Sequence, residues 1–280
     1  MSASPAAPDT AGWQARLALG FRPSPGRTVL AERSHRGPLA VQRPLYPEGE
    51  VCHCYLLHPP GGVVGGDRLE IEVTVAAQAH ALITTPGATK FYRSGGAQAV
   101  QTQRLRVDDG GALEWFPQEN IFFPGTESRL ATRIDLSGTA RFIGWEIGVL
   151  GRPSNGERFD RGRAEMRLEL WRDGRPLLIE RLTVVGGAPL LEQSAGLRGH
   201  PLTATLLATP AGREHLEAAR AALPPLGEGL CALTLVDGVL VGRYLGAQAE
   251  RARRCLIPVW RALRPLMLGR EAQPPRIWAT

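Results

Sequence analysis

The sequence predicts a fold dominated by β-strands, with about two helices in its C-terminal third. From about residue 16 to residue 181, short segments of alternating apolar and polar residues are separated by Gly, Pro, Asp or Asn. No helical pattern lies between these segments, whereas two such patterns occur after residue 209. This arrangement favours antiparallel or mixed β layers over a Rossmann-like α/β fold, in which helices alternate with strands.

The clearest strand pattern is RLEIEVTV, residues 68–75. Leu69, Ile71 and Val73 alternate with Glu70 and Glu72, which is the period-two pattern of a half-buried strand. Similar runs predict further strands in HALITT (80–85), AVQTQRLRVDDGGALEWFP (99–117), SRLATRIDLSGTARFIGWEIGVL (128–150) and RAEMRLELWRDGRPLLIERLTV (163–184).

Three turns that contain Asp-Gly predict β-hairpins. They lie at residues 109–111, 173–174 and 237–238, each between two strand-like segments. Asp and Gly tolerate the positive φ that tight hairpin turns require. We therefore expect the strands on either side of each turn to pair with each other.

The last third contains two helical patterns. In PAGREHLEAARAALPP (210–225), Pro210 can open the helix and Pro224 closes it. In AQAERARRCLIPVWRALRPL (247–266), Leu256, Val259, Trp260 and Leu263 have helical spacing on a face opposite the arginines. Pro258 is expected to kink or interrupt this second helix.

Composition excludes several classes of protein. The net charge is +6, Lys90 is the only lysine, and the arginines are scattered, whereas a nucleic-acid-binding protein usually concentrates them on one face. No apolar run approaches the roughly 18 residues that cross a bilayer. We expect no nucleic-acid or membrane partner. The four cysteines suit reduced thiols in a cytosolic protein.

The chain is predicted to hold one folded domain. Residues 1–15 lack a basic end followed by an apolar stretch, so they are interpreted as a loose N-terminal tail and not as an export signal. Residues 16–280 are interpreted as a single β-rich domain with a helical C-terminal part, since 43% hydrophobic residues suffice for a large core.

A glycine-rich stretch, HPPGGVVGGD (58–67), raises the question of phosphate binding. It fits neither a P-loop nor a dinucleotide fingerprint, because Asp67 follows the last glycine and a strand pattern comes next. The glycines are expected to bend a strand and allow close backbone approach. Asp67 then either caps this turn or lines a polar cavity.

The stretch TTPGATKFYRS (84–94) carries Lys90, Tyr92 and Arg93. These residue types suit an anion site or a protein interface, or an ordinary exposed strand end. In CHC (52–54), strand geometry places Cys52 and Cys54 on one side and His53 on the other, so buried structural cysteines are expected. No histidine spacing indicates a dedicated high-affinity metal site.

Carboxylates in apolar surroundings are further candidates. Glu114 and Glu119 flank a Trp-Phe-Pro turn, and Glu146 lies in the apolar run IGWEIG. Such a carboxylate either meets an arginine or lines a wet cavity. Two glutamates on neighbouring strands, such as Glu114 and Glu146, leave open a carbohydrate-active hydrolase.

Six stretches of the sequence, in order along residues 56–280, resemble the UreD family of urease accessory proteins, also called UreH, and the resemblance runs from about residue 17 to the C-terminus. They are LLHPPGGVVGGD, TTPGATKFYRS, LEWFPQENIFF, GWEIGVLGR, GERF and PRIWAT. The resemblance implies a layered, β-helix-like all-β fold with two helices. It also implies a cytoplasmic scaffold, not an enzyme, that binds apo-urease and recruits UreF and, through UreF, the nickel-carrying GTPase UreG. A β-helical carbohydrate-active hydrolase is the alternative.

The resemblance further implies that nickel passes through a water-filled interior toward urease, with no tightly bound cofactor in this chain. Carboxylate and hydroxyl oxygens suit transient nickel contact, because a conduit must release its ion. The predicted passage residues are Asp67, Glu146, Glu50 and Thr89. The residues predicted as partner interface or structural are Lys90, Tyr92, Arg93, Glu114, Gln118, Glu119 and Trp260. The segment with Trp260 and the PRIW end is predicted to face UreF.

Overall fold

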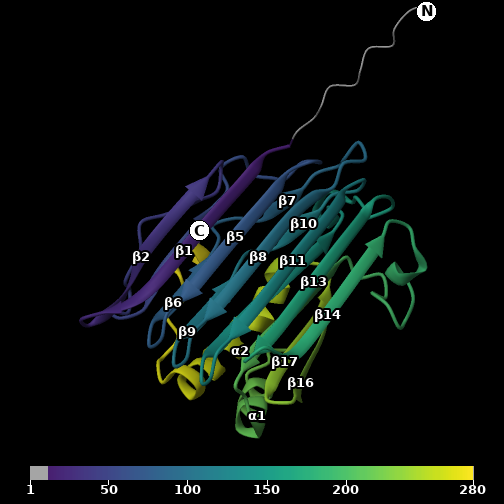
Figure 1. Cartoon of the computed structure of the whole chain (residues 1–280). Coiled ribbons are helices and arrows are strands. Elements are labelled where there is room, and N and C mark those ends of the chain that lie inside the picture. Colours follow the sequence, from purple (N-terminus) through teal and green to yellow (C-terminus); the bar gives the residue numbers. More distant parts are fainter. Residues whose placement is uncertain (1–11, 280) are drawn as a thin grey trace, which may run out of the picture.

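The computed structural model describes residues 12–279, which form two large β-sheets and two α-helices. A seven-stranded sheet crosses the view in Figure 1. In spatial order its strands are β14 (Arg175–Val185), β13 (Arg163–Arg172), β11 (Glu127–Leu136), β8 (Ala99–Val107), β5 (Arg68–Val75), β1 (Gln14–Ser24) and β2 (Arg27–Arg36).

The second sheet is ten-stranded. Its main path runs through β16 (Leu230–Val236), β17 (Val239–Gly246), β15 (Leu202–Thr209), β12 (Arg141–Leu150), β9 (Ala112–Phe116), β6 (His80–Thr84), β4 (Cys52–Leu57) and β3 (Ala40–Val41). Two short strands branch from it, β10 (Asn120–Phe122) and β7 (Thr89–Phe91). Short 3₁₀ helices are η1 (Pro153–Asn155), η2 (Pro189–Leu191) and η3 (Arg276–Ala279).

The chain passes from one sheet to the other at nearly every turn, so successive coils stack in parallel. In the seven-stranded sheet, Val73 pairs with Leu105, and Leu105 pairs with Ile134. The ten-stranded sheet repeats this order, with β4, β6, β9 and β12 parallel. The β-rich, layered, β-helix-like prediction is confirmed. The expectation of antiparallel pairing holds only for the outer strands, and the sheets are mixed.

The hairpin predictions had different outcomes. Strands β13 and β14 pair across residues 173–174, and β16 and β17 pair across residues 237–238. The prediction of a hairpin at residues 109–111 was wrong, because the strands on either side of this turn, β8 and β9, lie in different sheets. There Gly110 has φ +70°, and Asp109 accepts a hydrogen bond from the backbone N–H of Thr139, 2.7 Å away in the next coil. The tight turn is a corner between layers.

Two apolar cores hold these layers together. The larger core lies between the sheets and includes Leu69, Val73 and Leu105. The second core lies between the ten-stranded sheet and the helices α1 (Arg213–Ala221) and α2 (Ala249–Leu268). In Figure 1, α2 lies behind the seven-stranded sheet, and α1 lies below the lower ends of the strands.

Helix α2 continues past Pro258 as one helix of 20 residues. The predicted interruption is therefore wrong. The buried face of α2, with Leu256, Val259 and Leu263, packs against the sheet, and this tertiary packing offsets the hydrogen bond that proline cannot donate.

The N-terminal region is described in part. Residues 1–11 of the predicted tail lie outside the described residues, and β1 begins at Gln14. Within residues 12–279, none of the helices has the length and apolar character needed to cross a membrane.

Candidate functional site

A row of polar side chains crosses the inner face of the ten-stranded sheet. Glu146 on β12 is directly opposite Thr205 on β15, and Thr205 is directly opposite Arg243 on β17. Directly paired residues share a face of the sheet. The flanking positions on that face of β17, Val241 and Leu245, pack against the inter-sheet core, so the row points toward the interior.

A second row on the seven-stranded sheet faces the first. Thr132 on β11 is opposite Leu168 on β13, which is opposite Glu180 on β14. The hydroxyl of Thr132 donates a hydrogen bond to Glu146, and Arg243 forms an ion pair with Glu180. Thr205 donates its hydroxyl hydrogen to Glu180 at 3.2 Å. The two rows form a ladder of polar contacts between the sheets.

A cavity of about 470 Å³ lies along these rows and is lined by Glu146, Glu180, Thr205 and Arg243, among others. Burial raises the pKa of Glu146 to about 7, the negative charge of Glu180 adds to the rise, and the hydrogen bond from Thr132 opposes it. Glu146 therefore changes its protonation state near neutral pH. A carboxylate in this state can exchange a proton for a cation.

Asp67 caps the turn that the glycine-rich stretch makes. One carboxylate oxygen accepts the backbone N–H of Trp13 at 2.8 Å, and the other accepts the N–H of Val64 at 3.0 Å. Gly66 before it has φ +94°, which favours glycine. Of the two roles that the sequence left open for Asp67, the structure supports turn capping, and its passage role stays a prediction.

The glycine-rich stretch and the KFYRS stretch are neighbours. The N–H of Val63 donates to the carbonyl of Lys90 at 2.7 Å, and the N–H of Tyr92 donates to the carbonyl of Val63 at 2.9 Å. A Cβ on Gly62 would lie 2.1 Å from the ring of Tyr92. The glycines therefore allow the close backbone approach that the sequence predicted.

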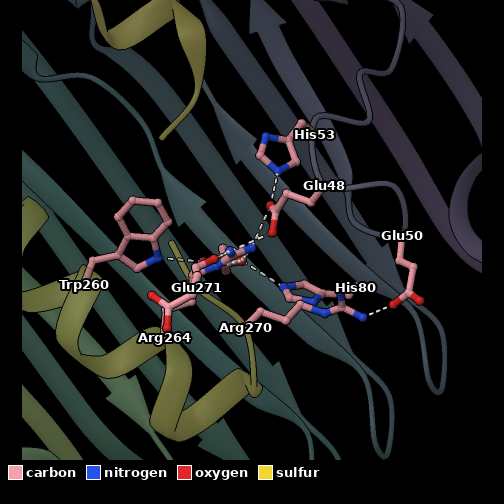
Figure 2. Close-up of polar contacts among 9 residues, drawn as sticks. Glu48, Glu50, His53, His80, Trp260, Arg264, Arg270 and Glu271 are labelled. Carbon is pink, nitrogen blue, oxygen red and sulfur yellow. Dashed lines mark hydrogen bonds and ion pairs between the residues drawn. The ribbon is translucent and has the colours of Figure 1, made fainter. Parts of the chain in front are cut away.

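Glu114 is fully buried and is bonded to His80, Trp260 and Arg264, which Figure 2 labels. Its carboxylate accepts hydrogen bonds from Trp260 Nε1 at 2.6 Å and Arg264 Nε at 3.0 Å. His80 Nε2 lies 2.8 Å from the same carboxylate. Burial alone would raise the pKa of Glu114, but the interactions with His80 and then Arg264 lower this pKa to about 2.

The same network includes Glu48, which lies next to Arg264, and His53, which Figure 2 shows joined to Glu48. Arg264 reaches Glu48 at 2.7 Å, and His53 Nε2 lies 2.6 Å from Glu48. Arg264 is thus fully enclosed between two carboxylates. The arginine that the sequence placed opposite the apolar face belongs to the buried face, one helical turn after Trp260.

This environment contradicts the hydrolase alternative. Glu114 is fully buried, and its carboxylate is already bonded to Arg264 and Trp260. A general acid must hold a proton near neutral pH and reach its substrate, whereas Glu114 is ionised and enclosed. The pair of Glu114 and Glu146 is therefore not a glycosidase pair, and Glu114 has a structural role.

Other predicted residues lie apart from the cavity. Glu50 is at the surface, with its side chain 57% exposed, and pairs with Arg270, so its predicted place in the interior is wrong. The backbone N–H of Thr89 donates to the carbonyl of Glu119 at 3.0 Å, and Thr89 is not among the described residues lining the cavity. Glu119 forms an ion pair with Arg253 of α2 at 2.6 Å.

Gln118 and Trp260 take structural positions. The backbone N–H of Gln118 donates to the Thr85 hydroxyl at 2.9 Å. Trp260 is fully buried, with its ring 5.3 Å from that of Phe116 and 5.5 Å from that of Trp278. Of the two roles predicted for Trp260, only the structural role fits this fold, and a direct contact with UreF is excluded because the side chain has no exposed surface.

Tyr92 and Arg93 line a larger surface cleft of about 1140 Å³. The rings of Tyr92 and Phe123 pack edge to face with their centroids 4.9 Å apart, and the Arg152 guanidinium lies 4.8 Å from the centroid of the Phe123 ring. Residues of the VLGR and GERF stretches line the same cleft. Motifs from two distant parts of the chain therefore meet at one surface, while Lys90 is outside its lining.

The CHC stretch folds as its alternation predicted. The sulfur atoms of Cys52 and Cys54 are 4.0 Å apart in the inter-sheet core, and His53 points to Glu48. Contact with Cys52, followed by burial, raises the pKa of Cys54, so Cys54 remains a thiol. Among residues 12–279, no group of three or more His, Cys, Asp or Glu side chains is arranged to hold a metal ion.

No pattern in the sequence was interpreted as a sign of the buried or functional positions of four residues, Glu180, Arg243, Arg264 and Glu48. A signal existed for the first two, because Glu180 lies between Leu178 and Leu182 on one face of its strand, and Arg243 lies between Val241 and Leu245. A charge on an otherwise apolar face indicates a buried partner. The loop position of Glu48 gave no comparable signal.

Known sequences resemble this chain over nearly its whole length. The model of the family described as UreD urease accessory protein matches residues 14–279. A protein of Alcanivorax borkumensis is 52% identical over 274 residues, which cover 96% of this chain and 93% of that protein. One from Azoarcus sp. is 51% identical over 272 residues (96% and 95%), and one from Klebsiella aerogenes is 46% identical over 269 residues (96% and 97%). All three are named urease accessory protein UreD.

Proposed function

Because this chain belongs to the UreD family of urease accessory proteins and therefore acts in urease maturation, we propose that it is the scaffold on which nickel reaches urease. In this proposal the chain binds apo-urease and recruits UreF and, through UreF, UreG. It is an accessory protein and not an enzyme. Nickel is its cargo, and the cytoplasm is its place of action.

The observation that carries the nickel part of this proposal is the polar cavity between the sheets. Glu146, Glu180 and Thr205 line about 470 Å³ of space in a fold whose other inward positions are mostly apolar. Oxygen donors bind divalent ions without the tight chelation that Cys and His sites give. A conduit needs such weak contacts, because each station has to release its ion.

The cleft at Tyr92 and Arg93 supports a partner-binding role. Tyrosine and arginine are enriched among residues that dominate binding energy at interfaces, and this cleft combines both with Phe123 and Arg152. We propose that a protein of the maturation complex docks there. The exposed Arg276 of the PRIW end remains a candidate contact for UreF after the exclusion of Trp260.

Urease activation in a strain lacking this gene tests the proposal. The strain is supplied with nickel and bicarbonate and complemented with the wild-type chain, with Glu146→Leu, or with the control Glu217→Gln, which alters an exposed glutamate of α1. We expect wild type and control to restore the nickel content of urease. Glu146→Leu should assemble the complexes but deliver less nickel. Normal nickel loading without the gene would refute the scaffold role.

A further inference from the structure

Arg243 stands at the outer end of the polar rows. Its side chain is 56% exposed, whereas that of its partner Glu180 is 23% exposed. Glu180 belongs to β14, the edge strand of the seven-stranded sheet, and Arg243 belongs to β17, next to the edge strand of the ten-stranded sheet. The ion pair therefore joins the two sheets at the edge where the stack of coils ends, and Glu146 lies two strands further in.

The guanidinium of Arg243 reduces the negative charge that the cavity presents to a cation. Glu146 and Glu180 together supply two carboxylates, and Arg243 neutralises the outer one. Coulomb repulsion from a fixed positive charge opposes the entry of any cation. A partly exposed ion pair is nevertheless weak. An ion that coordinates carboxylate oxygens directly can displace the guanidinium, whereas a weakly coordinating ion cannot.

We infer that Arg243 is a specificity-determining residue of this cavity, which limits occupancy of the Glu146 and Glu180 carboxylates to transient binding of a divalent transition-metal ion. This inference rests on the proposed function, since it assumes that the cavity carries nickel. Arg243 acts by competing for Glu180. When Arg243 is removed, Glu180 loses its only ion-pair partner among the described residues. Glu146 keeps its hydrogen bond from Thr132, and Arg167 and Arg181 still line the cavity. The free Glu180 carboxylate then retains the ion instead of releasing it.

Titration of the whole chain with Ni²⁺ alone, followed by calorimetry, tests this competition. We expect Arg243→Gln to bind Ni²⁺ more tightly than the wild-type chain by up to about five-fold, because the competing ion pair is partly exposed and weak. Arg243→Lys, which keeps the charge, should bind as weakly as wild type. The double variant Arg243→Gln with Glu180→Gln should lose the gain. Arg213→Gln is the matched control, because Arg213 pairs with Glu217 on the exposed face of α1.

Two results would overturn the inference. One is wild-type affinity in Arg243→Gln and in a second variant, Arg243→Ala, while both keep wild-type circular dichroism. The other is a gain that persists in the double variant, since the ion would then bind elsewhere. Either result would leave Arg243 as a structural tie between the sheets.

The nickel content of urease separates this inference from the proposed function. If urease needs the wild-type chain to be loaded with nickel, Arg243→Gln should lower the nickel content of urease although the complexes still assemble, because the variant chain retains the ion in its cavity. Equal delivery by Arg243→Gln, with unchanged Ni²⁺ affinity, contradicts only the role of Arg243. Full loading without the chain contradicts the proposed function, and the titration still decides whether Arg243 competes with the ion.

Discussion

The guanidinium of Arg264 on α2 lies 3.0 Å from the carboxylate of Glu114 on β9, and both side chains are fully buried. Together with Glu48 at 2.7 Å, this pair joins the C-terminal helix to the ten-stranded sheet. Buried ion pairs add little net stability, but losing one partner leaves the other charge uncompensated.

Arg264→Met should destabilise the fold by about 3–5 kcal/mol, because Glu114 and Glu48 lose their shared cation. The free energy of unfolding from urea titration measures the effect. Arg254→Met is the matched control on the same helix, since Arg254 is exposed and pairs with Glu250 one turn away; its cost should stay below about 0.5 kcal/mol. Equal losses in the two variants would show that the network does not hold α2.

Stability should fall steeply in acid because of Glu114. Its pKa is lowered from 4.5 to about 2 in the folded chain, so the unfolded chain takes up a proton first. Ionised Glu114 therefore contributes on the order of 3 kcal/mol to the free energy of unfolding above about pH 4.5, and this contribution is lost as pH falls toward 2. Unfolding free energies between pH 5 and about pH 2.5 should show a shallower slope in Glu114→Gln. A slope equal to that of wild type would contradict the assignment.

Glu146 should give the opposite dependence. Its pKa is raised from 4.5 to about 7 in the folded chain, so the folded protein holds the proton longer than the unfolded chain does. Stability should therefore decrease as pH rises from about 4.5 to about 7, by no more than about 3 kcal/mol. Glu146→Gln should flatten this segment of the profile, and Glu250→Gln, an exposed control, should leave it unchanged.

Asp67→Ala should lower the stability of the fold, and any loss of nickel in urease should follow from that lower stability. The substitution leaves the N–H groups of Trp13 and Val64 without their acceptor, which should cost about 1–3 kcal/mol. Asp67→Asn keeps one acceptor oxygen and should lose less. Comparison of thermal unfolding with the nickel content of urease separates the two roles. Reduced nickel at wild-type stability would favour the passage role that remains predicted for Asp67.

Arg93→Glu should weaken a partner complex that forms at the cleft. We expect about a ten-fold loss of affinity at low ionic strength and a smaller loss at high salt, because salt screens the attraction that is lost. Arg104→Glu is the control, since Arg104 lies on the exposed face of β8. Complexes with apo-urease and with UreF, measured at several salt concentrations, identify the partner. If neither complex weakens, the cleft is not an interface.

Much of the local structure was predictable from the sequence. The alternation in residues 68–75 predicted β5 because a half-buried strand exposes every second side chain. The spacing of Leu256, Val259, Trp260 and Leu263 predicted the buried face of α2. The sequence also identified Asp67 and Glu146 as carboxylates in constrained or apolar surroundings. In the structure Asp67 caps a turn and Glu146 lines the cavity.

The sequence by itself determined the β-rich class, the positions of most strands, the two helices and the family. Only the tertiary structure decided that residues 109–111 turn a corner between sheets, that Arg264 is buried, and that Glu146, Thr205 and Arg243 form one row. The physical reason is that periodicity records how a segment meets water and core, which is local. Strand partners and register depend on packing between segments far apart in the chain. This long-range packing brings the charged side chains of the cavity together.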